Sequence, residues 1–499
     1  MFDNINTGEL LAFILYFAAM LGIGLYFFAK SKSNGQADYF LGGRGMGSWV
    51  TALSAQASDM SGWLLMGLPG SILAAGFGKV WIAIGLAIGS YLAWLLIAGR
   101  LRNFSQVAND SITIPQYLNN RFLSSGLTLQ IISAIVFFVC FTVYVASGFK
   151  AGAALFATVL GVEDQTIPMI IFGAIIILYT FTGGFKAVCW TDFFQALLML
   201  CAMVFVPIFF AVTKDISFAA VTAENANYFN FLPSGKFDYE SFSDILSGLA
   251  WGLGYFGMPH ILVRYMAIKD SKMIKKSRRI ATSWVVITLG MAVVIGITGR
   301  VILPELAETG AASEMVFIKL VQMAFPGFVS GLLLSAILAA SMSTADSQLL
   351  VASSAFTSDI YKPVIRKNAS EKELLWVGRG LVVLLAVIAF FIARDPGSGT
   401  IMGLVENAWA GFGAAFGPVI ILSLFWKRFT YRGAVCGIIG GGLTVILWII
   451  FLSGPTGIYE LLPGFIVGML ACVIGTMLDK KPSEAVCALF DEADQKSRS

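Results

Sequence analysis

Residues 47–69 read Gly47-Ser-Trp-Val-Thr-Ala-Leu-Ser-Ala-Gln-Ala-Ser-Asp-Met-Ser-Gly-Trp-Leu-Leu-Met-Gly-Leu-Pro69. The stretch is apolar enough to cross a membrane, yet its middle carries an acid, Asp59, among serines and a glutamine. An aspartate at the centre of a lipid-facing helix costs about 2.5–3.5 kcal/mol even on the mildest scale. We therefore predict that this helix is broken and lines a cavity, because unwound backbone is tolerated there and not in lipid.

A second stretch, in the other half of the chain, reads Leu249-Ala-Trp-Gly-Leu-Gly-Tyr-Phe-Gly-Met-Pro-His260. Its glycines and proline remove side-chain packing and a backbone donor, so this helix is also predicted to unwind. A matched pair of interrupted helices is typical of transporters built from inverted repeats, which bind substrate and ion at the interruptions. One such interruption would be explained equally well as a packing kink. Two matched ones, one of them acidic, favour a binding site.

The composition is that of a membrane protein. Of the 499 residues, 58% are hydrophobic and 12% are charged, whereas soluble domains carry about 25% charged residues. Hydropathy predicts an all-α integral membrane protein with about 13 transmembrane helices. The apolar runs lie near residues 9–28, 46–72, 79–99, 127–157, 166–183, 188–212, 244–267, 280–303, 328–359, 375–393, 400–425, 434–452 and 460–478.

The charged residues predict orientation and exclude some partners. Lys and Arg gather in alternate loops, as in the run 269–279, and the positive-inside rule then places the N-terminus outside and the C-terminus in the cytoplasm. We expect one transmembrane domain, 1–480, followed by a short cytoplasmic tail, 481–499. The net charge of +4 is small and spread out, so no nucleic-acid partner is expected. The lipid bilayer is the expected surrounding, and no obligatory protein partner is evident.

The ninth predicted span offers oxygen ligands on one face. Ala340, Ser343, Thr344 and Ser347 recur at helical spacing. Hydroxyl and carbonyl oxygens are ligands that hard cations prefer. Small residues on one face also serve close helix packing in membranes, and the spacing alone supports both interpretations equally.

Several motifs resemble the sodium/solute symporter family. They are Thr51-Ala-Leu-Ser-Ala-Gln-Ala-Ser-Asp-Met-Ser-Gly-Trp63, Trp251-Gly-Leu-Gly-Tyr-Phe-Gly-Met-Pro-His260, Ala340-Ser-Met-Ser-Thr344 and Trp409-Ala-Gly-Phe-Gly-Ala-Ala-Phe-Gly-Pro418. The first two are most similar to the sodium/proline branch. The resemblance implies a LeuT-type fold of two inverted five-helix repeats, about 46–212 and 244–425. It also implies sodium-coupled symport of L-proline by alternating access, across the inner membrane of a bacterial cell. The alternative is a sodium-coupled symporter of another amino acid, an osmolyte, a carboxylate or a sugar.

The resemblance also assigns roles to individual residues, with the sodium ion as the expected cofactor. It implies a sodium site formed by the carbonyls of Ala57, Met60 and Ala340 and the hydroxyls of Ser343 and Thr344, with Asp59 needed for coupling. The positions implied for proline are Ser61, Gly62, Trp63, Tyr144, Trp251, Tyr255 and Pro259. Asp192 and Asp346 match, in part, a second cation site of some family members. A structural pairing of Asp346 with a nearby Lys or Arg is the alternative.

Other charged groups fall outside this pattern. Lys150 and Glu406 lie within apolar runs, where they pair with each other or extend toward the membrane surface. The lone histidine, His260, is interpreted as structural, and Arg44 as an inner-gate residue or a positive-inside anchor. No enzyme is predicted, since no nucleophile and base stand together in the sequence. The chain also lacks the GxxxxGK[ST] loop of a nucleotide-driven pump.

Overall fold

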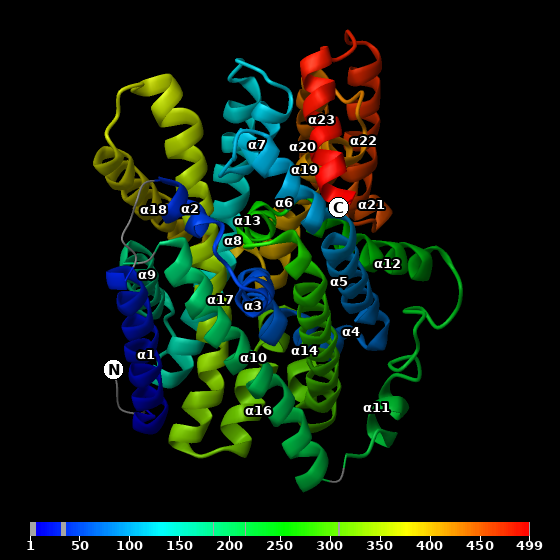
Figure 1. Cartoon of the computed structure of the whole chain (residues 1–499). Coiled ribbons are helices and arrows are strands. Elements are labelled where there is room, and N and C mark those ends of the chain that lie inside the picture. The colour runs from blue at the N-terminus through cyan, green and yellow to red at the C-terminus, as the bar shows by residue number, and fades with distance from the viewer. Residues whose placement is uncertain (1–5, 31–35, 183, 215, 308–309, 499) are drawn as a thin grey trace.

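The computed structural model describes residues 6–30, 36–182, 184–214, 216–307 and 310–498. Apart from one isolated bridge between Met46 and Ile268, the regular structure in these ranges is helical. Most of the long helices run roughly together between the top and the bottom of Figure 1.

The helices alternate with short turns along the whole chain. The α-helices of the first half are α1 Thr7–Lys30, α2 Gln36–Leu41, α3 Ser48–Asp59, α4 Leu68–Ala75, α5 Val80–Leu92, α6 Ala98–Val107, α7 Ile114–Arg121, α8 Thr128–Leu160, α9 Thr166–Thr182, α10 Phe185–Thr213 and α11 Ala219–Glu224. Those of the second half are α12 Tyr239–Ala250, α13 Pro259–Ala267, α14 Ile274–Ile302, α15 Ala311–Glu314, α16 Val316–Ala324, α17 Gly327–Ala355, α18 Glu371–Arg394, α19 Ile401–Phe425, α20 Tyr431–Phe451, α21 Ser453–Thr456, α22 Leu461–Met477 and α23 Glu484–Arg498. Tighter or wider turns join several of them, including η2 Trp63–Gly67, η4 Ala93–Ile97, η5 Trp251–Phe256 and η8 Phe356–Ile365.

The helices are long and apolar enough for a protein that crosses the membrane many times. Within the described ranges, 9 helical runs meet the length and hydropathy expected of a membrane span. Shorter apolar helices add to them, at Trp63–Ala75, Thr166–Phe181 and Leu461–Met477. The total of about 13 spans stays a prediction, because broken and short helices have no fixed relation to the number of crossings.

Both spans that were predicted to break do so. Helix α3 ends at Asp59, Met60 leaves the helical region with φ −87° and ψ 84°, and the chain resumes a helical path in the wide turn η2. Helix α12 passes into the tight turn η5, and Met258 is extended before α13 begins at Pro259. Proline suits the first position of a helix because the missing N–H has no partner there in any case.

The second break is held by close packing against α19. A Cβ added to Gly254 would lie 2.0 Å from Nε1 of Trp409. That indole nitrogen donates a hydrogen bond of 2.8 Å to the carbonyl of Trp251, the first residue of η5. The glycine therefore leaves room for an indole that bonds to the backbone of this turn, in a region where water is scarce.

Helix α3 lies at the centre of the bundle, and its residues Val50–Asp59 are all buried. It packs against α10, α13, α14 and α17. The contacts come from helices distant in sequence: Ser54 of α3 bonds to Asp192 of α10, and Ser343 of α17 bonds to Ala57. Because the break at residue 60 faces these neighbours rather than lipid, its free backbone groups have protein partners.

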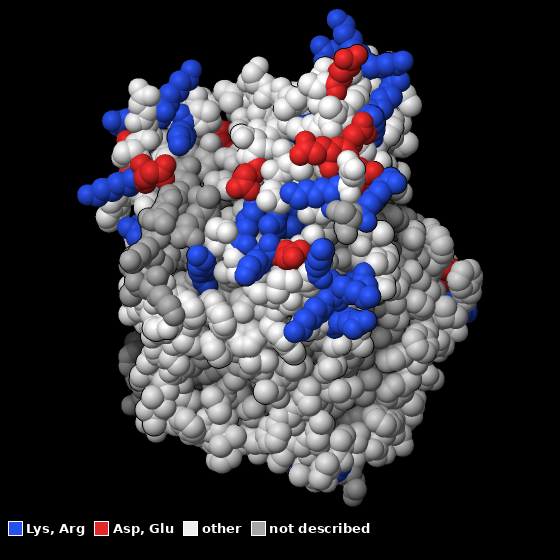
Figure 2. Space-filling view, in the orientation of Figure 1, with Lys and Arg blue, Asp and Glu red and all other residues white. Residues whose placement is uncertain are grey.

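The upper part of the molecule in Figure 2, its basic end, carries most of the visible charged residues, many of them basic, whereas the lower part shows few charges. Helix α23 lies at this basic end (Figure 1), where Asp494 pairs with Arg100 of α6 at 2.6 Å. Phe490 is buried and its ring meets that of Phe104 in a T-shaped contact at 5.3 Å. The tail beyond residue 480 thus folds back onto the transmembrane helices.

The packing at the second break predicts the effect of one added methyl group. Gly254→Ala should lower the unfolding midpoint in detergent, because overpacking of this kind costs about 1–3 kcal/mol. The matched control is Gly290→Ala in α14, where an added Cβ meets no atom within 4 Å. Thermal unfolding followed by tryptophan fluorescence compares the two variants. Equal midpoints would show that the glycine is not required for packing.

Candidate functional site

The acid predicted for coupling lies at the point where the two broken helices meet. Asp59 is fully buried, and Tyr255 of η5 donates to its Oδ2 at 2.5 Å. The carbonyl of Asp59 accepts from Oη of Tyr144 at 2.9 Å and from Nε1 of Trp63 at 3.2 Å. The second carboxylate oxygen, Oδ1, has no hydrogen-bond partner among the described residues. The site therefore presents one carboxylate oxygen that is free to meet a positive charge.

Four of the predicted sodium ligands come together around Ala57, two residues before this acid. Ser343 of α17 donates to the carbonyl of Ala57 at 2.7 Å and to that of Ala340 at 3.2 Å. Thr344 donates to the same carbonyl of Ala57 at 3.3 Å. Met60, the remaining position, is fully buried at the break, and its Sδ lies 3.9 Å from Oγ1 of Thr288. These carbonyl and hydroxyl oxygens are uncharged and suit a monovalent cation.

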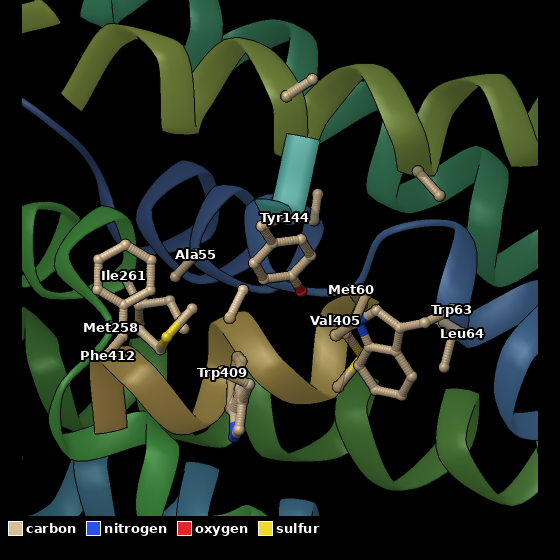
Figure 3. Close-up of a cluster of buried hydrophobic side chains, with 14 of the residues drawn as sticks. Ala55, Met60, Trp63, Leu64, Tyr144, Met258, Ile261, Val405, Trp409 and Phe412 are labelled. Carbon is tan, nitrogen blue, oxygen red and sulfur yellow. The ribbon is translucent and has the colours of Figure 1, made fainter. Parts of the chain in front are cut away.

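The predicted substrate residues enclose the same break. Tyr144 points from α8 toward the segment that carries Met60, with Trp63 and Trp409 on neighbouring walls (Figure 3). The rings of Trp63 and Trp251 lie 6.5 Å apart. A Cβ on Gly62 would lie 2.6 Å from Cβ of Ala151. The break is thus bounded by aromatic rings and has no room for a larger side chain at position 62.

Two predicted substrate positions differ in what they contribute. Ser61 lies in the break itself and is buried, and its N–H donates to the carbonyl of Asp59 at 3.1 Å. Pro259 begins α13, so it shapes the second break rather than offering a polar contact. His260, interpreted as structural, packs its ring against those of Phe141 and Tyr144, at 5.7 and 6.3 Å.

Sequence reasoning missed two polar side chains beside the break. Gln56 is fully buried one turn before Met60, and neither atom of its amide has a partner among the described residues. Ser341 is buried with its hydroxyl also unpartnered, 3.3 Å from the position of a Cβ on Gly62. Both residues lie in motifs that resemble the sodium/solute symporter family. Their polar side chains within these apolar motifs were the feature that could have identified them as site residues.

The two acids of the predicted second cation site meet an arginine. Arg264 of α13 forms an ion pair of 3.0 Å with Asp192 of α10, and both side chains are buried. Arg264 also bonds to Ser347 and, through Nε, to Ser54 at 2.9 Å. Asp346 joins this network through Ser347 at 3.3 Å, and its Oδ2 has no partner in the described part of the chain. Arg264 therefore pairs with one of the two acids, and Asp346 has no ion-pair partner among the described residues.

The remaining charged groups do not form the pair that the sequence suggested. Lys150 donates to the carbonyl of Gly399, and Glu406 lies in a different cavity, described below. Arg44 pairs with Asp110 at 2.7 Å and donates to the carbonyl of Met266 near the end of α13. Arg44 thus anchors the loop before α3 to the second broken span. This contact is compatible with both of its predicted roles.

Comparison with known proteins agrees with this geometry. A family model for the sodium:solute symporter family matches residues 39–441. A sodium/proline symporter of Haemophilus influenzae is 46% identical over 498 residues, which cover 98% of each chain. The osmoregulated proline transporter OpuE of Bacillus subtilis is 46% identical over 477 residues, 95% of this chain and 96% of its own. The sodium/proline symporter of Escherichia coli is 45% identical and covers 98% of this chain and 97% of its own.

Solved structures give the fold. A substrate-bound, outward-open Na⁺-coupled sialic acid symporter superposes with a TM-score of 0.78 at 20% identity, covering 96% of this chain and 99% of its own. MhsT in complex with L-phenylalanine superposes with a TM-score of 0.55 at 13% identity, covering 86% of this chain and 97% of its own. The chain therefore belongs to the sodium:solute symporter family, and its all-helical membrane fold is the LeuT type that the motifs imply.

Proposed function

We propose that this protein is a sodium-coupled symporter that carries L-proline into a bacterial cell by alternating access. The observation that carries the proposal is the meeting of the two broken helices, where Tyr255 donates to the buried carboxylate of Asp59. An uncharged set of oxygens stands two residues away, at Ala57. A single acid next to neutral ion ligands suits the transport of one cation with a zwitterion. The curated relatives of Haemophilus influenzae and Escherichia coli carry the name sodium/proline symporter.

The proposed sodium site uses the oxygens gathered around Ala57. The carbonyls of Ala57, Met60 and Ala340 and the hydroxyls of Ser343 and Thr344 would coordinate the ion. A hydroxyl that donates its proton to a carbonyl keeps lone pairs that can face a cation. Because these ligands are neutral, the ion's charge must be balanced nearby. Asp59, which lies two residues after Ala57, supplies that balance.

The proposed substrate site lies beside the ion. Proline is a compact zwitterion with a secondary amine and an apolar ring. The Ser61–Gly62 segment offers a hydroxyl and backbone N–H groups to the carboxylate, and helix starts favour anions. The rings of Trp63, Tyr144, Trp251 and Tyr255 would enclose the pyrrolidine, and a cationic amine near an aromatic face gains roughly 0.5–2 kcal/mol.

The proposed topology places the basic end of the molecule in the cytoplasm. Lys275, Lys276 and Arg279 are exposed at the start of α14, and Lys and Arg gather at the end of the molecule where α23 lies (Figure 2). The first residues of α1 lie toward the other end (Figure 1). The N-terminus would then be outside and the tail 481–499 cytoplasmic, after a single transmembrane domain with repeats at about 46–212 and 244–425. In this arrangement the chain moves its substrate without transforming it.

The first test of this function is uptake driven by sodium. Reconstituted protein should accumulate radiolabelled proline when Na⁺ is high outside, and Asp59→Asn should nearly abolish accumulation because the amide keeps the shape and loses the charge. Asp59→Glu should retain a little uptake with weaker apparent Na⁺ affinity. Correct insertion of both variants is checked by their unfolding midpoints. Equal uptake on a proton gradient without Na⁺, or normal uptake by Asp59→Asn, would contradict the proposal.

The second test concerns the substrate site. Gly62→Val and Trp251→Ala should each raise the KM for proline about tenfold or more, equivalent to about 1.4 kcal/mol. Their apparent Na⁺ affinity at saturating proline should change much less, because neither side chain is among the proposed sodium ligands. Gly290→Ala serves as the unaffected control. In counterflow assays, ring analogues should compete, whereas leucine and glucose should not. Stronger competition by leucine or a sugar would favour a different solute.

The third test separates a second cation site from a structural ion pair. If Asp346 takes part in binding a second cation, Asp346→Asn should lower the Hill coefficient for Na⁺ while stability is kept. Asp192→Asn leaves the guanidinium of Arg264 buried without its counter-ion, and breaking such a pair costs about 3–5 kcal/mol. It should therefore lower the unfolding midpoint as well. An unchanged Hill coefficient in correctly folded Asp346→Asn protein would remove the second site.

A further inference from the structure

A polar cavity of about 320 Å³ borders the second break at Trp251 and lies between α5, α12, α19 and the turn before α22. Its lining includes Lys79, Asp244, Glu406 and Glu460. Glu406 lies near the start of α19, whereas Leu424, near the other end of that helix, accepts from Arg100 beside α23. The cavity therefore lies toward the end of the molecule opposite the basic end, which is the outer end in the proposed topology.

The charges in this cavity do not balance. Lys79 and Asp244 form an ion pair of 2.9 Å and neutralise each other. Glu406 and Glu460 have no ion-pair partner in the ranges that the structure describes. Glu460 is only 4% exposed, and its Oε1 is buried without a hydrogen bond from any other described residue. A carboxylate held out of water without a partner is stabilised by taking up a proton or by a nearby positive charge, and the cavity beside the two glutamates has room for a cation.

The number of acids limits the kind of cation. The described residues contain no group of three or more His, Cys, Asp or Glu side chains close enough to hold a metal ion. A divalent ion would need more charged ligands than the two glutamates supply. A monovalent cation, either Na⁺ itself or the ammonium group of a zwitterion, matches the charge that is left.

The cavity and the proposed substrate site share Trp251. Trp251 lines the cavity and stacks on Tyr459 at 5.1 Å, whose hydroxyl donates to the carbonyl of Glu406 at 2.9 Å. Trp251 belongs to the same unwound turn as Tyr255, which bonds to Asp59. A movement of Trp251 would thus open a path from the two glutamates to the acid at the break.

We propose that this cavity is an antechamber in which Glu406 and Glu460 hold a monovalent cationic group before it passes Trp251. The group is Na⁺ or the ammonium of the incoming zwitterion, and the inference rests on the proposed transport function. A cavity lined by charges of one sign, with walls of low dielectric constant, raises the local concentration of ions of the opposite charge and speeds their entry. Such a site increases the rate of capture and leaves the equilibrium affinity of the central site unchanged.

Kinetics and equilibrium binding together test this role. Glu406→Gln and Glu460→Gln in reconstituted protein should each lower kcat/KM for proline, for Na⁺ or for both by about threefold or more. The equilibrium Kd for proline at saturating Na⁺ should stay within about twofold. The control is Glu240→Gln, which removes an exposed acid of α12 that does not line the cavity. Equal kcat/KM in all three variants, or a parallel loss of equilibrium affinity, would overturn the antechamber.

Thiol labelling measures the charge in the cavity without transport. Ser453 lines the cavity, and Ser453→Cys is made in a chain whose accessible Cys201, Cys436 and Cys487 are replaced by serine. A cationic methanethiosulfonate should react about fivefold faster than an anionic one, and Glu406→Gln should shrink this ratio. Equal rates for the two reagents would overturn the proposal.

Protection against labelling distinguishes the two sources of the cation. Slower reaction with Na⁺ alone, at constant ionic strength, identifies the ion as occupant. Slower reaction with proline alone identifies the ammonium group, and the absence of protection by both overturns the antechamber. If the protein takes up no proline, the proposed function fails, while a charge-selective, Na⁺-protected labelling pattern would still support the cavity as a cation site.

Discussion

Backbone that is unwound inside a membrane must find protein, ion or substrate partners, and the rest of this structure follows from that constraint. At the first break the carbonyl of Asp59 is satisfied by Tyr144 and Trp63. At the second, the carbonyl of Trp251 is satisfied by Trp409. Tyr144 and Trp409 come from other helices, so the breaks help to fix how α8 and α19 pack. The hydrogen bond from Tyr255 to Asp59 then joins the two breaks directly.

The sequence predicted the features whose cause is local. An acid within an apolar run, or glycines beside a proline, disfavours a continuous helix wherever the segment lies. The breaks at Met60 and before Pro259 were therefore visible, and so was the Ser343/Thr344 face, because helical spacing alone aligns it. The likeness to the family added the ion and the substrate. Local signals cannot give ligand identity, since neutral oxygens look alike in a sequence.

Interactions between distant residues were beyond the sequence. Arg264 pairs with Asp192 across the core. The sequence had suggested only that Asp346 pairs with some nearby Lys or Arg, without indicating which one. Lys150 and Glu406 were plausible partners by depth, yet Lys150 contacts the carbonyl of Gly399 and Glu406 lines a separate cavity. In each case the sequence predicted how deep the side chain lies in the membrane. It did not predict which neighbouring helix the side chain faces. Pairing depends on which helix faces which, and that is decided by packing.

The central helix α3 offers a physical route for coupling between the proposed sites. Ser54, which bonds to both Asp192 and Arg264, stands one turn before Ala57, the carbonyl shared by Ser343 and Thr344. A cation at Ala57 would raise the electrostatic potential at Arg264. The distance is short and the intervening residues are buried, so charges interact more strongly there than in water. Arg264 belongs to α13, which continues the second broken span after the break. Ion binding on α3 would therefore act on both α13 and α10, the two helices that the Arg264–Asp192 ion pair joins beside α3.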